Sequence, residues 1–259
     1  MQIELDLNKN IMQNAEIYFE RSKKAKKKID GINEAIFKAE KKLNSLKSQP
    51  VKTEAAAKAE QRKKEWYEKF RWFVSSEGFL VIGGRDATTN EIIIKKHTDS
   101  NDVVFHTDMA GSPFFVIKAS SANDGKIGKI TLQEAANATF TYSRAFKLGL
   151  ATAKVFWVKP DQVSKEANAG EYLEKGAFVI RGKTNYISPE IDLAVGMTKD
   201  GAVMGGPAGA VKKNCERYAV LERGKEKISD TAKKIRQKIG GDLDDIIRAM
   251  PAGEVEIRK

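Results

Sequence analysis

Residues 79–86 have the sequence FLVIGGRD, and this stretch decides how the globular part of the chain is built. Its consecutive apolar residues, closed by a glycine pair, are typical of a buried strand that ends in a turn. The charged pair Arg85 and Asp86 follows the turn directly. The stretch therefore predicts a sheet with a buried strand that carries polar side chains to one of its ends.

Helices are expected after two capping boxes further along the chain. In the first box, Thr88 precedes Glu91 by three residues, which favours a short helix over residues 90–96. The β-branched run at 92–94 leaves a strand open as the alternative. The second box, Thr131 with Glu134, predicts the best helix of this region, ending near Gly149.

Short apolar segments surround these helices. Strands are expected at residues 103–105, 114–117, 153–158, 178–181, 186–187, 193–195 and 219–221, and closing helices at 225–239 and 242–250. One long helix among many short strands predicts an α+β fold, with a mixed central sheet and flanking helices.

The region before the globular part has the pattern of a long helix. Apolar or small residues recur there in alternating steps of three and four, the period of a coiled coil: Ile11, Ala15, Tyr18, Ser22, Ala25, Ile29, Ile32, Ile36, Ala39, Leu43 and Leu46. Pro50 ends this pattern, and a second helical run covers Thr53 to Phe70. The two runs predict an antiparallel hairpin with its tip near Pro50. The expected domains are a basic coiled-coil arm, 1–70, and an α/β domain, 71–259.

Positive charge is concentrated in this arm. The chain has a formal net charge of +11, and sixteen Lys and Arg against eight Asp and Glu lie between residues 20 and 70. One cluster has little acidic compensation: Arg21, Lys23, Lys24, Lys26, Lys27 and Lys28. Such a basic ridge binds phosphates without regard to sequence, although a solvated helix face is the ordinary alternative. The apolar seam is too narrow and alanine-rich for a membrane-surface helix, so RNA is the expected partner.

Composition excludes several classes of site. Cys215 is the only cysteine, and His97 and His106 are the only histidines, so no multi-cysteine or histidine-rich metal centre is expected. There is no apolar run long enough to span a bilayer and no secretory signal at the start. We therefore expect a cytoplasmic protein that requires no cofactor or metal.

Several motifs, taken in order, resemble the RNA-binding domain of the NFACT family of ribosome quality-control factors. They are WYEKFRWF at 66–73, SSEGFLVIGGRD at 75–86, DVVFHTD at 102–108, GSP at 111–113, QVSK at 162–165, GEYL at 170–173, KGAF at 175–178, IRGK at 180–183 and GGP at 205–207. Residues 14–19, NAEIYF, are similar to the start of the family's coiled coil. Residues 159–161 depart from the more aromatic, histidine-containing sequence expected before QVSK, which places base stacking there in doubt.

The resemblance implies a partner and a task. Members of the family bind a large ribosomal subunit that carries a stalled peptide on tRNA, and they recruit tRNA so that the stalled chain receives an untemplated C-terminal tail. The expected partners are thus the large ribosomal subunit, tRNA and rRNA. A full member has an N-terminal domain with helix-hairpin-helix elements, which we do not find, so a fragment or a split form is expected. The first arm would then pair with that domain or with a second copy.

Arg85 and Asp86 are the first candidates for RNA contact. An arginine at the end of a buried strand can bind a phosphate through two parallel hydrogen bonds, with the aspartate orienting it. The alternative is structural: an Arg–Asp bridge or an Asx-turn that closes the loop.

His106 lies near the end of an expected strand, between Asp102 and Asp108. A lone histidine is most often a hydrogen-bonded structural residue, and in an RNA-binding role it would stack on a base or donate to a phosphate. Paired with either aspartate it could instead serve acid–base chemistry in a nuclease or RNA-modifying enzyme. No recognisable nucleophile signature accompanies it, so we expect a non-catalytic protein, with this enzyme as the alternative.

Two further groups of lysine and arginine complete the candidate set. Lys212 and Lys213 lie in the first turns of a short helix expected after Gly205-Gly206-Pro207, where free amides can hold a phosphate. A basic rim with interleaved aromatic residues is expected from Lys165, Lys175, Arg181 and Lys183. An extracellular adhesin is a second rival class, because bacterial relatives carry a fibronectin-binding label, but the lysine content and the lack of a signal segment argue against it.

Overall fold

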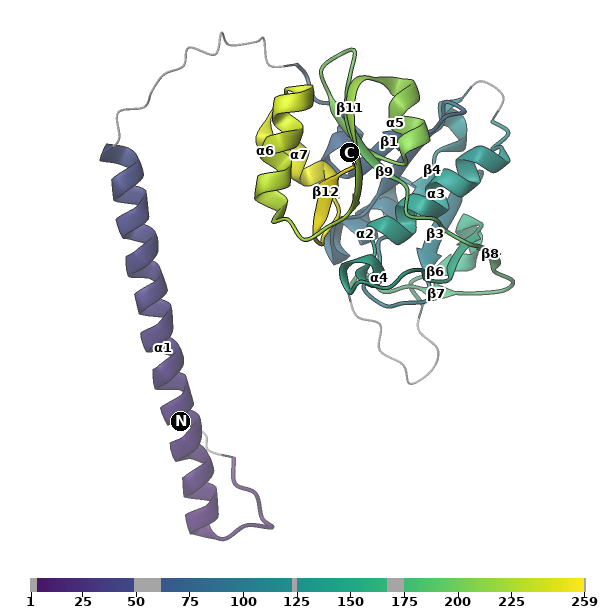
Figure 1. Cartoon of the computed structure of the whole chain (residues 1–259). Coiled ribbons are helices and arrows are strands. Elements are labelled where there is room, and N and C mark those ends of the chain that lie inside the picture. The colour runs from purple at the N-terminus through teal and green to yellow at the C-terminus, as the bar shows by residue number, and fades with distance from the viewer. Residues whose placement is uncertain (1–3, 49–61, 123–124, 167–174, 259) are drawn as a thin grey trace. The chain divides into compact units, whose positions relative to one another are not determined.

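The computed structural model describes residues 4–48, 62–122, 125–166 and 175–258. The chain divides into two compact units, Met1–Glu60 and Gln61–Lys259 (Figure 1). None of the described helices combines the length and the apolar character needed to cross a lipid bilayer.

The first unit consists mainly of helix α1, Ile11–Ser48, which confirms the long helix predicted from the heptad pattern. Asn10 begins it, because the Asn10 side chain accepts a hydrogen bond from the Gln13 amide at 2.8 Å. Asn14 holds the preceding residues in a hook by bonding the amide and the carbonyl of Asp6 at 2.8 Å and 3.0 Å. Asn14 is buried, whereas most of the α1 side chains up to Lys41 are exposed.

The prediction of a second helix over residues 53–70 is wrong for its last part, from residue 62 onward. Residues 62–65 are irregular, Trp66–Lys69 form a single 3-10 turn, η1, and the strand β1 begins at Arg71. Phe70 is fully buried in the core of the globular unit, so hydrophobic packing there overrides the helical pattern. The rest of that segment, and with it the tip of the expected hairpin, lies outside the described residues.

The larger sheet of the globular unit has the strand order β1-β2-β4-β3-β5-β8. Its strands are β1 Arg71–Val74, β2 Leu80–Gly83, β4 Phe115–Ile117, β3 Val103–Thr107, β5 Val155–Val158 and β8 Asn185–Ile187. Every strand pair described is antiparallel, so the expectation of a mixed sheet is wrong. The connection from β1 to β2 is a short turn, and turns of that length allow only antiparallel pairing.

A second sheet has the order β10-β9-β11-β12. Its strands are β10 Val203–Gly206, β9 Leu193–Thr198, β11 Cys215–Arg223 and β12 Val255–Ile257, with helices α5 Ala208–Asn214, α6 Ile228–Ile239 and α7 Leu243–Ala249 packed on it. A two-stranded ribbon, β6 Val163–Ser164 with β7 Val179–Ile180, stands apart from both sheets. The globular unit is thus α+β with flanking helices, as predicted.

Helices α2, Ala87–Lys96, and α3, Lys129–Thr141, accompany the larger sheet, and α3 runs across strands β3, β4 and β5 (Figure 1). Neither expected capping box caps its helix. Asp86 is the N-cap of α2, and Gly128 is the N-cap of α3. Glu134 instead accepts a hydrogen bond from the Ser76 amide at 2.8 Å, and α3 ends at Thr141, with a separate turn, α4 Arg144–Lys147, after it.

Candidate nucleic-acid interface

A cavity of about 590 Å³ opens beside the larger sheet. Four segments that are distant in the sequence line it: the end of β2 with the start of α2 (84–90), the end of β3 (106–108), the turn before β4 (110–114) and residues 175–180. Small-molecule sites usually have volumes of about 300–1,000 Å³, so this cavity can hold a ligand of that size.

Two glycines allow the walls to approach one another. A Cβ atom at Gly84 would lie 1.8 Å from the Asn90 side-chain oxygen, which accepts the Phe114 amide at 3.1 Å. Gly176 has a φ of +80°, and a Cβ atom there would lie 2.6 Å from the Cα of Ala87. Glycine is the residue that both positions require, so the GG and KG motifs fix the distance between α2 and its neighbours.

Aromatic rings form a continuous row along this side of the sheet. The strand register places His106 opposite Phe156, and Phe156 opposite Tyr186, with ring centroids 6.2 Å and 6.0 Å apart. Phe114 stacks on His106 at 4.2 Å, and Phe178 meets Phe114 edge-on at 5.3 Å. The row runs from Tyr186, 57% exposed at the sheet edge, to the half-buried Phe178 in the cavity wall.

His106 is held as a neutral ring inside this row. Its Nε2 atom lies 3.1 Å from the Ser112 carbonyl oxygen, the position of a donated hydrogen bond. Burial lowers the pKa of His106 below its usual value near 6.5. Asp108 contacts Tyr186, and Asp102 forms a buried ion pair with Lys118. In the described part of the chain, neither aspartate is hydrogen-bonded to His106.

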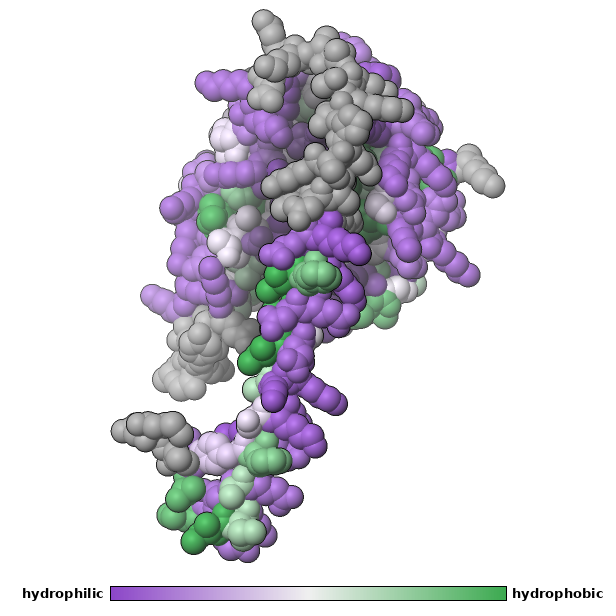
Figure 2. All heavy atoms as spheres, turned by 90° about the vertical axis from the view of Figure 1, so that its left-hand side faces the viewer, coloured by the Kyte–Doolittle hydropathy of each residue, from purple (hydrophilic) through white to green (hydrophobic). Residues whose placement is uncertain are grey.

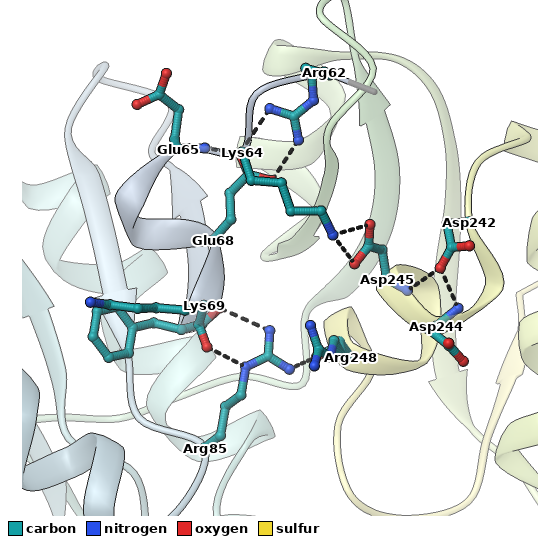
Figure 3. A network of polar contacts seen from close by, with 11 residues as sticks. Arg62, Lys64, Glu65, Glu68, Lys69, Arg85, Asp242, Asp244, Asp245 and Arg248 are labelled. Carbon is teal, nitrogen blue, oxygen red and sulfur yellow. Dashed lines mark hydrogen bonds and ion pairs between the residues drawn. The ribbon is translucent and has the colours of Figure 1, made fainter. Parts of the chain in front are cut away.

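Arg85 lines the cavity, and its guanidinium is directed at main-chain carbonyls. Its side-chain nitrogens donate to the oxygens of Lys69 at 3.1 Å, Phe70 at 2.9 Å and Arg248 at 2.9 Å. Figure 3 shows the guanidinium lying between the segment at 69–70 and the end of α7. Burial, reinforced by the neighbouring cations Arg71 and Arg248, lowers the pKa of Arg85 to about 10. Arg85 therefore connects the first segment of the globular unit, at residues 69–70, with the end of α7 near its C-terminus.

Asp86 has the structural role of an N-cap. Its carboxylate accepts the Thr89 amide at 2.8 Å and the Thr89 hydroxyl at 3.0 Å, and these bonds lower the pKa of Asp86. The Arg85–Asp86 bridge is not among the ion pairs of the described residues. Asp86 still lines the cavity, with Lys175 close enough to lower its pKa further.

The four residues of the expected basic rim have different environments. Lys175 is exposed and lines the cavity. Lys165 lies behind the wall, where its ammonium group donates to the Ala177 carbonyl at 3.0 Å and lies 5.1 Å from the centre of the Phe178 ring. Arg181 is exposed and 3.7 Å from the Glu166 carboxylate, and Lys183 is exposed next to the ribbon β6–β7.

Lys212 and Lys213 belong to a different part of the globular unit. Both are exposed on α5, beside the second sheet, and neither lines the cavity. The Ala208 amide at the start of α5 donates to the Asp192 carboxylate at 3.1 Å, and Lys213 donates to the Ser76 carbonyl at 2.5 Å. The expected phosphate position thus has a carboxylate in it already.

All six residues of the basic ridge on α1 are exposed: Arg21, Lys23, Lys24, Lys26, Lys27 and Lys28. Apolar residues of α1 are exposed as well, among them Ile29, Ile32 and Ile36. Figure 2 shows hydrophobic residues interrupted by hydrophilic ones along the helix, most densely toward its N-terminal end.

Sequence reasoning singled out His106, Phe178 and Tyr186, but it missed Phe114 and Phe156 of the aromatic row and one buried cation, Arg71. The register that places Phe156 opposite His106 cannot be read from either strand segment alone. Arg71 is buried, donates to the Met250 carbonyl at 3.1 Å, and lies over the Tyr142 ring at 4.3 Å from its centre.

Comparison with known proteins assigns part of this chain to a family. Residues 69–182 match the model of the NFACT protein RNA binding domain. The archaeal Rqc2 homolog aRqcH of Methanocaldococcus jannaschii is 42% identical over 205 residues, covering 76% of this chain and 30% of that protein. The ribosome quality control complex subunit NEMF of Homo sapiens is 39% identical over 180 residues, covering 68% of this chain and 16% of its own length.

Among solved structures, the C-terminal part of the fibronectin/fibrinogen-binding protein from Streptococcus suis overlaps with a TM-score of 0.38 and 16% identity. The overlap covers 70% of this chain and 77% of that one. The chain spans less than a third of the length of the two relatives described above. All residues that line the cavity fall within the matched range 69–182.

Proposed function

Because residues 69–182 belong to the NFACT family of RNA-binding domains, we propose that this chain binds RNA in ribosome quality control. The observation that carries the proposal is that the family match encloses the whole cavity and most of the aromatic row. The human relative, which matches 68% of this chain, is a ribosome quality control complex subunit by name. The same role for this chain follows as the simplest hypothesis.

The finer proposal concerns which RNA is bound. Engagement of a large ribosomal subunit with stalled peptidyl-tRNA, and recruitment of tRNA for C-terminal tailing, is the task that the family resemblance implies, and it would place the protein in the cytoplasm. The exposed ridge at residues 21–28 supports contact with rRNA or tRNA backbone, because unpaired lysines release counterions when they meet phosphates. The exposed apolar seam of α1 supports pairing with another helix as a coiled coil.

We infer a binding role rather than catalysis for His106. A general base needs a partner that orients its ring, and the two nearby aspartates are engaged with Tyr186 and Lys118 instead. A ring stacked on Phe114 and bonded to a main-chain carbonyl suits contact with a base.

Titration of the purified chain against tRNA, duplex RNA and isolated large ribosomal subunits, each at two salt concentrations, tests the proposal. We expect binding to tRNA or to the subunits that weakens steeply with salt and varies little with sequence. Absence of binding to all three at low salt would overturn the RNA-binding role of the chain. Cleavage or modification of the RNA, lost in His106→Ala, would replace it with the enzyme alternative.

A further inference from the structure

Two of the cations that line the cavity have no ion-pair partner in the described part of the chain. Arg71 and Arg85 both line it, and neither forms an ion pair with an acidic side chain in the described part of the chain. The Nε atom of Arg71 is buried and has no hydrogen-bond partner. In the described part of the chain their hydrogen-bond partners are main-chain carbonyls, which carry no net charge and so do not neutralise the two guanidinium groups.

Such an arrangement favours an anion. Burial lowers the pKa of both arginines, which means that their charged forms are poorly solvated where they lie. Asp245, the nearest acidic residue of the α7 segment, is already paired with Lys64 at 2.8 Å (Figure 3). An anionic group entering the cavity would gain two guanidinium partners without displacing a carboxylate.

Another part of the cavity lining favours a flat aromatic group. His106 and Phe178 both line the cavity and are half-buried, so part of each ring faces open space. Burial lowers the pKa of His106, which favours its neutral ring, and a neutral aromatic ring can stack on a base. Asp86 and the exposed Lys175 supply an acceptor and a donor at the same cavity.

We propose that the cavity binds one nucleotide of a single-stranded RNA segment, with its base against His106 and Phe178 and a phosphate group toward Arg71 and Arg85. This inference rests on the proposed RNA-binding function and names the unit that is recognised. An unstacked nucleotide is of a size that a cavity of about 590 Å³ can hold. The exposed Tyr186 at the end of the aromatic row would then support the neighbouring base.

Binding of small probes to the intact chain tests the inference. Nucleoside 5′-monophosphates, the matching nucleosides and inorganic phosphate are titrated separately by calorimetry. We expect the monophosphates to bind at least tenfold more tightly than either the nucleosides or phosphate, since the site needs both the ring and the anion. Equal affinity for monophosphate and phosphate, or no binding of the monophosphate, would overturn the inference.

A variant pair keeps the test independent of folding and of the arm. Phe178→Leu retains an apolar wall but removes the ring, and Phe37→Leu makes the same change at an exposed position of α1. We expect Phe178→Leu to weaken a single-stranded oligonucleotide about fivefold to hundredfold, the range for losing one stacked ring, and Phe37→Leu to have no effect. The melting temperatures of both variants check that they fold.

Failure of this inference differs from failure of the RNA-binding function. Salt-sensitive binding of tRNA that is unchanged in Phe178→Leu, together with inert monophosphates, would leave the chain an RNA-binding protein with an unused cavity. Protection of the cavity by a peptide and not by an oligonucleotide would likewise overturn the nucleotide assignment.

Discussion

The ion pair of Asp102 with Lys118 is the most deeply buried charge pair described in the globular unit. Both residues are buried, and the Asp102 carboxylate also accepts the amides of Asp99 at 2.8 Å and Ala119 at 2.9 Å. Lys118 is further bonded to the carbonyl of His97 at 2.9 Å. Asp102 therefore fixes the loop before β3 and the end of β4, and its role is structural.

Asp102→Asn should destabilise the globular unit by up to about 3–5 kcal/mol, because the buried Lys118 ammonium then keeps only the exposed Asp99 carboxylate, at 2.7 Å, as its anion. Chemical denaturation followed by tryptophan fluorescence measures the loss, with Asp108→Asn as an exposed control expected within about 0.5 kcal/mol of the parent. A stable Asp102→Asn protein that has lost an RNA-processing activity would instead favour the enzyme alternative.

Stability should fall as the pH drops from 7.5 to 5.5. Burial lowers the pKa values of His97 and His106 in the folded chain below 6.5, their value in the unfolded chain. The unfolded state then binds more protons, so acid favours unfolding by up to about 1.4 kcal/mol per pH unit for each histidine.

Thermal melts across this pH range, repeated for His106→Gln and His97→Gln, measure how much each histidine contributes to the loss of stability at low pH. A parent whose stability stays constant from pH 7.5 to 5.5 would contradict the direction given for both groups.

The candidate residues show that a sequence predicts which residues lie near a site more readily than it predicts what each residue does there. Arg85 and Asp86 follow the buried strand β2, as the FLVIGGRD stretch predicted, and they line the cavity, while their contact with RNA stays a prediction. The alternative interpretation of Asp86 as a loop-closing residue comes closest to the structure, because it caps α2. The role of Arg85 depends on carbonyls at 69–70 and at 248, and residues so distant in the sequence cannot be identified as partners from local pattern.

Among the elements, the strongest periodicities are predicted best. The heptad seam predicted α1, and the apolar run at 79–82 predicted most of β2. The helix expected up to Phe70 is wrong because Trp72 and Phe73 pair with β2 and draw the preceding residues into the core. The contacts between the rings of the aromatic row could not be predicted, since they depend on the register of the three strands β3, β5 and β8 and on the approach of Phe114 and Phe178.

The basic ridge of α1 should account for much of the salt-sensitive RNA binding. Lys24, Lys27 and Lys28 lie three and four residues apart, on one side of the helix, and are exposed. Reversal of all three to glutamate should weaken every RNA tested and lower the slope of log affinity against log salt by about 2–3, since each lost phosphate contact removes roughly 0.7–0.9.

A matched control distinguishes the ridge from overall charge. Lys233, Lys234 and Lys238 are exposed on α6, and their reversal to glutamate changes the net charge of the chain equally. Equal losses in both triple variants would show that net charge, and not the α1 ridge, governs binding.

At the scale of the whole molecule, the chain consists of two units that differ in how far their side chains are buried. The globular unit has an extensive buried core, whereas most described side chains of the arm are exposed. Each unit carries one kind of RNA contact in our proposals: phosphates for the ridge and an unstacked nucleotide for the cavity. Two weak contacts joined by one chain reinforce one another, because the second forms at the high effective concentration set by the first.

Cutting the chain between residues 60 and 61 should therefore separate affinity from folding. We expect residues 61–259 alone to melt cooperatively within a few degrees of the intact chain, because its core lies within the globular unit. Its affinity for tRNA should fall by about 10²–10⁴, the usual loss when linked contacts are parted, while affinity for a nucleoside monophosphate stays unchanged. Calorimetric melting and filter binding measure the two quantities on the same preparation. A fragment that binds tRNA as tightly as the intact chain would remove the arm from RNA recognition, and a fragment that fails to fold would make the arm part of the globular structure.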